Sequence, residues 1–457
     1  MCGALQACPS FLYLGRGQFI GRGRNDLTLK ADPMIQIPFS RHRLDNGLEV
    51  VLSHDPGAPV VAVNLWYRVG SRDERPGRAG FAHLFEHLMF QGSEHVPETA
   101  HFAFIEQAGG SLNGSTWLDR TNYYETLPAN YLELGLWLES DRLGWLVGAM
   151  TQEKLDNQRD VVKNERRWIV DNQPYGDWDE RLQAMIYPPD HPYHHSVIGS
   201  MEDLDAASLE DVETFFKTYY RPNNAVLTLC GDFQEERALE LIDRWFGDIP
   251  AGPPVPPIPG RTDIPTTLEE PVRQVVEQDT SLSRVYRAYR IPPYGDDGWY
   301  PAGVAAHVLA WGKASRLNRR LVRDRRLAQD VVAYAFPVVV GAAMLVLWAT
   351  ARPGVPVDEL EKALDEELLE MAGVADNEVK RAVRLIEARQ LSELQKVDER
   401  ADQLSMFTCL FDDPGLINTE LDRIRGVSAT DLHAFAERHL DPARAATLIY
   451  LPKGGGA

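Results

Sequence analysis

Residues 82–94, AHLFEHLMFQGSE, carry two histidines and a glutamate at a spacing suited to metal binding. In a helix, His83 and His87 lie on one face, one turn apart, and Glu86 lies beside that face. A single histidine on an apolar helix is more often a core residue than a ligand, but H-x-x-E-H rarely arises by chance. A catalytic zinc has three protein ligands and a water, so the chain must supply one more ligand.

The segment KLDNQRDVVKNERRWIV, residues 154–170, contains a candidate for that third ligand. Its apolar residues recur every seven positions, at Leu155, Val162 and Ile169. At about 100° per residue, Glu165 falls in the middle of this stripe, where a carboxylate needs a partner. The residues alone leave two interpretations open: Glu165 binds a metal, or it forms a salt bridge with Arg166 or Arg167.

The composition excludes several other classes of protein. The chain has 457 residues, of which 44% are hydrophobic and 25% charged, as expected for a globular protein of two or three domains. Its formal net charge of −20 argues against nucleic acid or an anionic membrane surface as partner, because both require clustered Lys and Arg. The 4 cysteines include no C-x-x-C pair, which favours a reducing compartment.

The start of the chain lacks the basic and apolar regions of a secretory signal. We therefore expect residues 1–33 to be a poorly structured extension and the protein to be cytoplasmic, with the periplasm as the alternative. Residues 331–351 are uncharged and long enough to span a bilayer, but Pro337 and Gly341 interrupt them. Their β-branched and aromatic residues predict two adjacent buried strands, so no membrane span is expected.

A proline-rich segment, IPAGPPVPPIPGRTDIP, divides the chain into two parts of similar length. Neither a helix nor a central strand can persist through so many prolines. We expect a domain at residues 34–248, a linker at 249–267 and a second domain at 268–457.

The two parts resemble each other at a single offset of 220 residues. The clearest identical pairs are Ser208/Ser428, Asp211/Asp431, Phe215/Phe435, Pro222/Pro442 and Ala225/Ala445. This pattern predicts a capped helix followed by a strand in each half. The same offset places Gly303 opposite His83 and Ala306 opposite Glu86, so the second half repeats the pattern without the metal residues.

Strand-like segments and helices of 3.6-residue period alternate irregularly in each half. An early hairpin is expected around Asp55–Ala58. A doubly wound parallel sheet is disfavoured because no glycine-rich phosphate loop follows a strand. We therefore expect an α+β fold of two homologous α/β sandwich domains, each with a largely antiparallel sheet and flanking helices.

H-x-x-E-H with a distal glutamate in VVKNERR resembles the inverzincin metallopeptidases of the pitrilysin, insulinase and mitochondrial processing peptidase group. The resemblance implies that His83, His87 and Glu165 bind Zn²⁺, and that Glu86 is the general base of a zinc metalloendopeptidase. It also implies a clamshell of two domains, the second of them inactive. Zinc held by such ligands lowers the pKa of its water to about 7.

A second match to this family is GGSLNGSTWLDRTNYYETL, residues 109–127. The family has an N-A-x-T edge strand that pairs with an extended substrate, and the matching residues are Asn113, Gly114, Ser115 and Thr116. Pairing of this kind binds backbone, so it favours short or unfolded polypeptides as substrates. The residues alone are equally compatible with an ordinary polar hairpin strand.

Besides Gly114 in place of the family alanine, the chain departs from the family pattern at three positions. Gln158 stands where an acid often precedes the zinc glutamate, which leaves the surroundings of the zinc uncertain. Val322 and Gln329 stand where the second domain often has an Arg and a Tyr for substrate contacts. We therefore expect a heterodimer with a homologous partner that supplies the Arg/Tyr pair. The nearby Arg323, Arg325 and Arg326 keep a homodimer open.

Two other functions remain as alternatives: a non-catalytic core subunit of a larger complex, and a metal-stabilised peptide-binding module. The intact metal motif speaks against the first, and only an assay of hydrolysis separates the second from an enzyme. A further histidine-rich segment, HPYHHSVIGS from His191, is expected to be a structural loop, because His194 and His195 are adjacent and cannot share a helical face.

Overall fold

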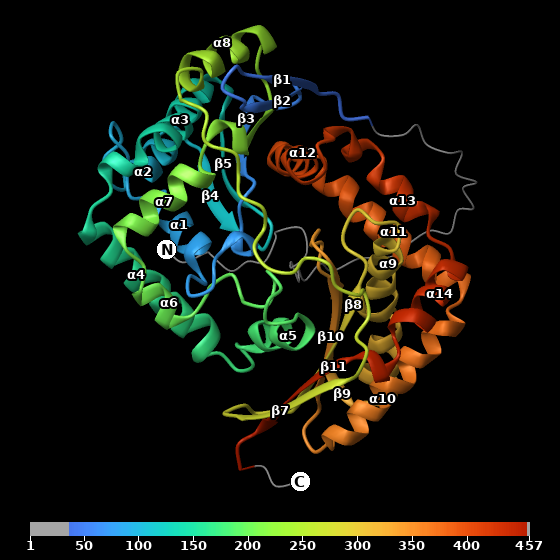
Figure 1. Ribbon diagram of the computed structural model, residues 1–457. Coiled ribbons are helices and arrows are strands. Elements are labelled where there is room, and N and C mark those ends of the chain that lie inside the picture. The colour runs from blue at the N-terminus through green and yellow to red at the C-terminus, as the bar shows by residue number, and fades with distance from the viewer. Residues whose placement is uncertain (1–35, 455–457) are drawn as a thin grey trace.

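The structure, a computed structural model, describes residues 36–454 and has two related halves (Figure 1). The expected extension at residues 1–33 lies outside the described residues. The first sheet has the order β1 (Ser40–Arg43), β2 (Glu49–His54), β6 (Ala225–Gly231), β3 (Val60–Tyr67), β5 (Thr121–Pro128) and β4 (Ser111–Thr116). The second has the order β7 (Val272–Gln278), β11 (Ala446–Pro452), β8 (Arg284–Ile291), β10 (Ala343–Ala351) and β9 (Ala328–Ala335).

Both sheets are mixed and mostly antiparallel, as expected. Only β2·β6 and β7·β11 are parallel pairs among the described strands. Helices of the same half cover the outer face of each sheet (Figure 1). The α+β fold of two related sandwiches predicted from the sequence is therefore confirmed.

The related helices of the two halves follow the 220-residue offset. The pairs are α1 (Phe81–Leu88) with α9 (Trp299–Ala310), α3 (Leu132–Ala149) with α10 (Val357–Leu369), α4 (Gln152–Arg166) with α11 (Asp376–Glu393), α5 (Trp178–Ile186) with α12 (Val397–Phe411), and α7 (Leu209–Tyr219) with α14 (Ala429–His439). In α7 and α14, Ser208 with Asp211 and Ser428 with Asp431 form the same capping box. A strand follows each of these two helices, so the predicted repeat of a capped helix and a strand is confirmed.

The remaining elements are short or belong to one half. The α-helices are α2 (Ala100–Gln107), α6 (Met201–Asp205), α8 (Glu235–Phe246) and α13 (Glu420–Gly426). The 3-10 turns are η1 (Ser71–Asp73), η2 (Ala129–Tyr131), η4 (Pro222–Asn224), η6 (Glu370–Gly373), η7 (Pro414–Asn418) and η8 (Pro442–Arg444), and η3 (Arg167–Asp171) and η5 (Asn318–Asp324) are π-helical. Residues 250–271, within which most of the proline-rich segment falls, contain no helix or strand.

The hairpin expected around Asp55–Ala58 is wrong. Strands β2 and β3 follow each other in the sequence, but β6 lies between them and pairs with both. The Asp55 amide donates to the Gly231 carbonyl, and the Asp232 amide donates to the Val60 carbonyl, on the two sides of the end of β6. The local turn signal did not reveal a central strand supplied from more than 150 residues away along the chain.

The uncharged segment at residues 331–351 falls mainly in two paired strands, β9 and β10, as predicted. Val346 pairs with Tyr334 and Trp348 pairs with Val332 across the antiparallel ladder. Within residues 36–454, no helix is both long enough and apolar enough to cross a membrane.

The two halves exchange one pair of related helices. Helix α12 of the second half packs on β3 and β6 of the first sheet, where Ser405 Oγ donates to Thr228 Oγ1 at 2.8 Å (Figure 1). Helix α5 of the first half packs on β8 and β11 of the second sheet, where Trp178 stacks on Tyr286 with ring centroids 5.6 Å apart. Each sheet is therefore covered on one face by a helix from the other half.

Candidate metal centre

Helix α1 is fixed at its start by a buried carboxylate. Gly80 precedes it with a φ of 89°, and a Cβ there would meet the Ile198 carbonyl at 2.5 Å, so glycine is required. Glu74 accepts hydrogen bonds from the amides of Gly80 and Ala82 at 3.0 and 2.7 Å. A carboxylate at a helix N-terminus accepts hydrogen bonds from the free amides there, and its negative charge interacts favourably with the positive end of the helix dipole. This arrangement sets the position of the two histidines that follow.

Helices α1 and α4 bring the three predicted ligands together. Nε2 of His83 and Nε2 of His87 lie 3.9 and 3.3 Å from Oε2 of Glu165. One ligand atom from each of the three residues lies within 4.8 Å of the others. His83 is 4% exposed and Glu165 7%, so both side chains lie inside the protein.

The competing interpretation of Glu165 as a salt-bridge partner does not match the structure. Arg166 pairs with Glu180 and donates to the Gly199 carbonyl. Arg167 donates to Asn164 Oδ1 at 2.6 Å. Both arginines therefore point away from Glu165, which faces the two imidazoles.

The histidines have the properties of metal ligands rather than of satisfied core residues. Burial, together with the nearby His87, holds the pKa of His83 well below its usual value, which keeps the ring neutral. Burial lowers the pKa of His87, but its contact with Glu165 and the charge of Glu86 raise it by more, so the net shift is upward. Nδ1 of His83 is buried without a hydrogen-bond partner, and Nε2 of His87 faces Oε2 of Glu165 at 3.3 Å. Two imidazoles and one carboxylate that converge in this way are a set of donors that fits a divalent zinc ion.

Glu86 lies beside this cluster, held by the edge strand. Thr116 Oγ1 donates a hydrogen bond of 2.7 Å to its Oε2. Burial raises the pKa of Glu86 above its usual value, although Thr116, His87 and Arg120 act in the opposite direction. A carboxylate with a raised pKa accepts protons more readily near neutral pH, as a general base must.

The four residues of the predicted substrate strand lie on β4, at the edge of the first sheet. Asn113 is exposed, Gly114 is buried, and Ser115 Oγ donates to Asn122 Oδ1 on β5 at 2.6 Å. The difference from the family alanine at Gly114 has a local reason. A Cβ there would meet the rings of Tyr123 and Phe90 at 3.1 and 3.2 Å.

The other departures from the family pattern also have defined surroundings. Gln158 is buried beside the metal cluster, where it contacts His87 and contributes to raising the pKa of that ring. Val322 lies in η5 and is half-buried, and Gln329 is exposed on β9. Among the nearby arginines, Arg325 pairs with Glu366 of α10 at 2.9 Å and Arg323 pairs with Asp324.

The second half has no equivalent cluster at the related positions, which hold Gly303, Ala306 and Leu385. Nδ1 of His307 donates a hydrogen bond of 2.9 Å to the Gly303 carbonyl, and burial lowers the pKa of His307 to about 4. Within residues 36–454, the cluster on α1 and α4 is the one group of three His, Cys, Asp or Glu side chains that could hold a metal ion.

Sequence reasoning missed the group that supports α1. Nε2 of His195, which was expected to be structural, lies 2.7 Å from Oε2 of Glu74. His195 therefore holds the carboxylate that fixes the start of α1. The two residues are 121 positions apart, and no local pattern links them. The hydrogen bond from Thr116 to Glu86 was likewise unforeseen, although both residues were predicted site residues.

Comparisons with known proteins agree with this geometry. The sequence model described as Insulinase (Peptidase family M16) matches residues 49–187, and the model described as Peptidase M16 inactive domain matches residues 206–386. The zinc protease PqqE of Helicobacter pylori is 30% identical over 354 residues, which are 74% of this chain and 76% of PqqE. An uncharacterized zinc protease of Mycobacterium tuberculosis is 26% identical over 427 residues, or 93% of this chain and 95% of that protein.

The fold is also found in solved structures. The crystal structure of a protease from Helicobacter pylori superposes with a TM-score of 0.84 and 25% sequence identity. The superposition covers 91% of this chain and 99% of that chain. The similarity therefore extends over both halves.

Proposed function

Because the chain belongs to the insulinase family of peptidases, peptidase family M16, we propose that it is a zinc-dependent endopeptidase. The observation that carries the proposal is the buried cluster of His83, His87 and Glu165 with Glu86 beside it. The three ligands would hold Zn²⁺. When bound, the ion supplies a positive charge that acidifies water and polarises a peptide carbonyl.

Glu86 performs the proton transfers in this proposal. Its carboxylate takes a proton from the attacking water and delivers it to the leaving amine. Thr116 keeps one oxygen of Glu86 in place through its hydrogen bond, which leaves the other oxygen for the water. The raised pKa of Glu86 suits a group that must both accept and release a proton.

The substrate lies as an extended strand along β4. This strand pairs with β5 and has no second partner among the described strands, so a peptide that adds to its outer edge takes the place of the Asn113 side chain at the Gly114 amide. Asn113, Gly114, Ser115 and Thr116 form that edge, and the hydrogen bond from Thr116 to Glu86 ties it to the metal cluster. Backbone pairing selects short or unfolded polypeptides, because a folded protein has no free strand to offer.

We also propose the assembly and the division of labour within it. Residues 34–248 form the zinc-bearing domain, and residues 268–457, after the linker at 249–267, form an inactive one. A homologous partner subunit supplies the Arg and Tyr that Val322 and Gln329 do not. We assign the protein to the cytoplasm, with the periplasm as the alternative.

Replacement of Glu86 tests the proposal directly. We expect Glu86→Gln to bind zinc as the wild type does and to lose peptidase activity by about 100- to 10,000-fold. Zinc content and cleavage of an unstructured fluorogenic peptide are measured on the same preparation. Glu106→Gln, at an exposed position of α2, is the matched control and should retain activity. Equal turnover by Glu86→Gln and wild type would contradict the role of Glu86. Zinc binding without hydrolysis by either protein would favour a peptide-binding module.

A further inference from the structure

The turn between β9 and β10 of the second half is anchored to the first half by two of its backbone amides. The Val339 amide donates to Oδ2 of Asp119 at 3.2 Å, and the Val340 amide donates to the hydroxyl of Tyr193 at 3.0 Å. Asp119 lies just before β5, and Tyr193 lies in the 187–200 loop, which joins α5 to α6. Both side chains are buried, so this anchor lies inside the contact between the two halves.

From this anchor, a chain of buried polar contacts runs into the first half. The hydroxyl of Tyr193 donates to Oδ1 of Asp119, and burial raises the pKa of Tyr193 well above its usual value, so the hydroxyl keeps its proton. Arg72 donates to the same Oδ1 at 2.8 Å, and its Nε lies 3.6 Å from Oδ2 of Asp73. Asp73 accepts a hydrogen bond of 2.9 Å from the Gly70 amide. The contacts therefore connect the second half to η1, which precedes the metal helix α1.

Two routes from the anchor meet at Glu74. The first is the chain of contacts that ends at Asp73, because Glu74 is the next residue in the sequence. The second is the 187–200 loop, in which His195, two residues after Tyr193, lies 2.7 Å from Glu74. Glu74 in turn accepts hydrogen bonds from two amides at the start of α1. Both routes therefore reach the carboxylate that fixes the metal helix.

The 187–200 loop also contacts the helix that carries Glu165. A Cβ on Gly199 would clash with the carbonyl of Ala79, so the end of the loop is in close contact with the chain that enters α1. The Gly199 carbonyl accepts a hydrogen bond of 2.7 Å from Arg166, the residue after Glu165 on α4. One loop therefore touches the elements that place all three metal ligands.

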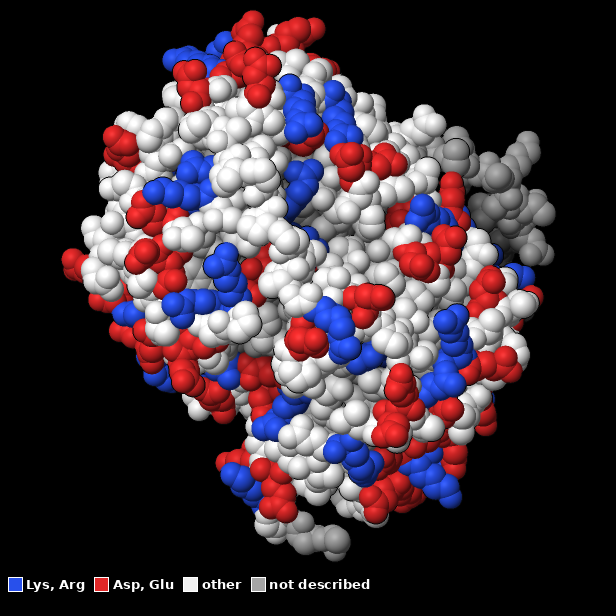
Figure 2. Space-filling view, in the orientation of Figure 1, with Lys and Arg blue, Asp and Glu red and all other residues white. Residues whose placement is uncertain are grey.

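The charges of this network differ from those on the surface of the molecule. On the face seen in Figure 2, acidic and basic side chains are interspersed and exposed to water, where ion pairs contribute little to stability. In the network, the side chains of Asp73, Asp119 and Arg72 are 4%, 2% and 12% exposed. Removing charges from water costs free energy, and only well-placed partners offset that cost. The loss of one partner should therefore be felt by the others.

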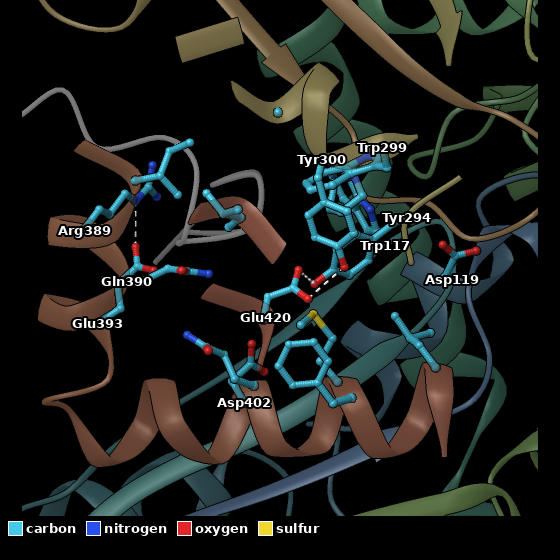
Figure 3. Close-up of a pocket in the computed structure, with 18 of the residues that line it drawn as sticks. Trp117, Asp119, Tyr294, Trp299, Tyr300, Arg389, Gln390, Glu393, Asp402 and Glu420 are labelled. Carbon is cyan, nitrogen blue, oxygen red and sulfur yellow. Dashed lines mark hydrogen bonds and ion pairs between the residues drawn. The ribbon is translucent and has the colours of Figure 1, made fainter. Parts of the chain in front are cut away.

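Close packing between the halves does not continue beside the anchor. Asp119 lines a cavity of about 150 Å³, with Trp117 on the side of the first half and Trp299 on the side of the second (Figure 3). Pro337, two residues before Val339, lines the same cavity. Because the halves do not fill this space, the position of the turn depends on the directional hydrogen bonds at its edge.

We propose that Tyr193, Asp119 and Arg72 are positioning residues through which the second half supports the metal centre. When the β9–β10 turn is seated on Asp119 and Tyr193, η1 and the 187–200 loop hold Glu74. Glu74 then holds the start of α1 and with it the two histidines. The half without metal ligands thereby raises the affinity of the other half for zinc. This inference rests on the metal centre of the proposed peptidase and assigns a role to its second half.

Tyr193→Phe tests this role, because it removes the hydroxyl and keeps the ring. Tyr187→Phe is the matched control. Tyr187 is buried at the start of the same loop and donates to the Ala342 carbonyl of the same turn at 3.0 Å, but among the described residues its hydroxyl bonds only to that turn. A general loosening of the contact between the halves would affect both variants alike.

We expect the affinity for zinc to fall about three- to tenfold in Tyr193→Phe and to stay within about twofold of the wild type in Tyr187→Phe. The affinity is measured on the full chain by competition with a chelating dye. Equal losses in the two variants, or an unchanged affinity in Tyr193→Phe, would overturn the proposal.

A double-mutant cycle tests the route to α1. If Tyr193 acts through Glu74, Tyr193→Phe should have little further effect on zinc affinity in the Glu74→Gln background, because the common end of both routes is already altered. Losses of affinity that simply add would show that Tyr193 does not act through Glu74 and would contradict the proposed route.

Zinc affinity and hydrolysis together separate this inference from the proposed function. A wild type that binds zinc and cleaves no peptide, with weaker zinc binding by Tyr193→Phe, would support the positioning role and contradict the endopeptidase. Peptide cleavage by the wild type, with equal zinc affinity in all three proteins, would support the endopeptidase and overturn the positioning role.

Discussion

Glu165 is the residue on which the metal assignment depends. The spacing of H-x-x-E-H placed His83 and His87 together in the sequence, but Glu165 reaches them only because α4 packs against α1. Oε2 of this carboxylate lies 3.9 and 3.3 Å from Nε2 of the two imidazoles, whereas Arg166 and Arg167 bind other partners. A salt-bridge role would have required one of those arginines to turn inward.

We expect Glu165→Gln to lose zinc. An amide is a poorer ligand than a carboxylate, and the site would also lose the charge that compensates the ion. Affinity for zinc should fall by more than about 100-fold, beyond the effect of changing a residue that only supports a ligand. Zinc affinity is measured by competition with a chelating dye, and circular dichroism checks the fold. Glu153→Gln, exposed on the same helix, should bind zinc normally. Unchanged affinity in Glu165→Gln would exclude this residue as a ligand.

At the scale of the elements, the sequence predicted the features that depend on local patterns and missed those that depend on contacts between distant parts of the chain. The helix bearing His83 and the paired strands β9 and β10 follow from spacing, β-branched content and the break at Pro337. The insertion of β6 between β2 and β3 does not, because the pairing partner lies far along the chain. The same holds for Glu74 and His195, whose contact depends on how a loop folds back on α1.

On the exchanged helix α5, ionisation of the Asp179 carboxyl lowers the stability of the fold. Burial raises the pKa of Asp179 to about 6, and one of its oxygens is buried without a hydrogen-bond partner. In the unfolded chain this pKa is about 4. The folded state therefore binds the proton more tightly, so this contribution to stability is present below pH 4 and is lost as the pH rises through about 6.

We expect Asp179→Asn to stabilise the protein at pH 8 and to have little effect at pH 4, because the neutral amide removes the cost of burying a charge. The urea concentration at the midpoint of unfolding, followed by tryptophan fluorescence at both pH values, measures this. Glu202→Gln, on the short helix α6, controls for the loss of one negative charge at a less buried site. A gain in stability of equal size at both pH values would show that the carboxylate of Asp179 is not the cause.

At the scale of the whole molecule, the exchange of α5 and α12 makes the two halves interdependent. Each sheet would expose an apolar face if the other half were removed, since Trp178 covers Tyr286 on the second sheet and α12 covers β3 and β6 on the first. Arg400 of α12 also pairs with Asp55 after β2. The proline-rich segment between the halves contributes no helix or strand of its own.

A cut in that segment should therefore leave the halves together. We expect a chain with a protease site inserted within residues 251–257 to elute as one complex after cleavage, and to retain zinc. Each half produced alone should aggregate, because its sheet lacks the covering helix. Size-exclusion chromatography before and after cleavage measures the association. Separation of the cleaved halves into two soluble, folded species would contradict the interdependence.

The proposed partner subunit follows from what the second half lacks. Under the resemblance that motivates this proposal, Val322 and Gln329 replace an Arg and a Tyr, and Arg325 is already paired with Glu366. A homologous chain with the Arg/Tyr pair but no zinc motif should raise kcat/KM for an unstructured peptide by at least about tenfold when mixed in equimolar amount. The combined Val322→Arg and Gln329→Tyr substitution should reduce that dependence, since it restores the missing side chains within one chain. Full activity of the isolated protein, with no gain on adding the partner, would contradict the heterodimer. If that active protein formed a dimer with itself, the result would support the homodimer, in which the substrate-binding role falls to Arg323, Arg325 or Arg326.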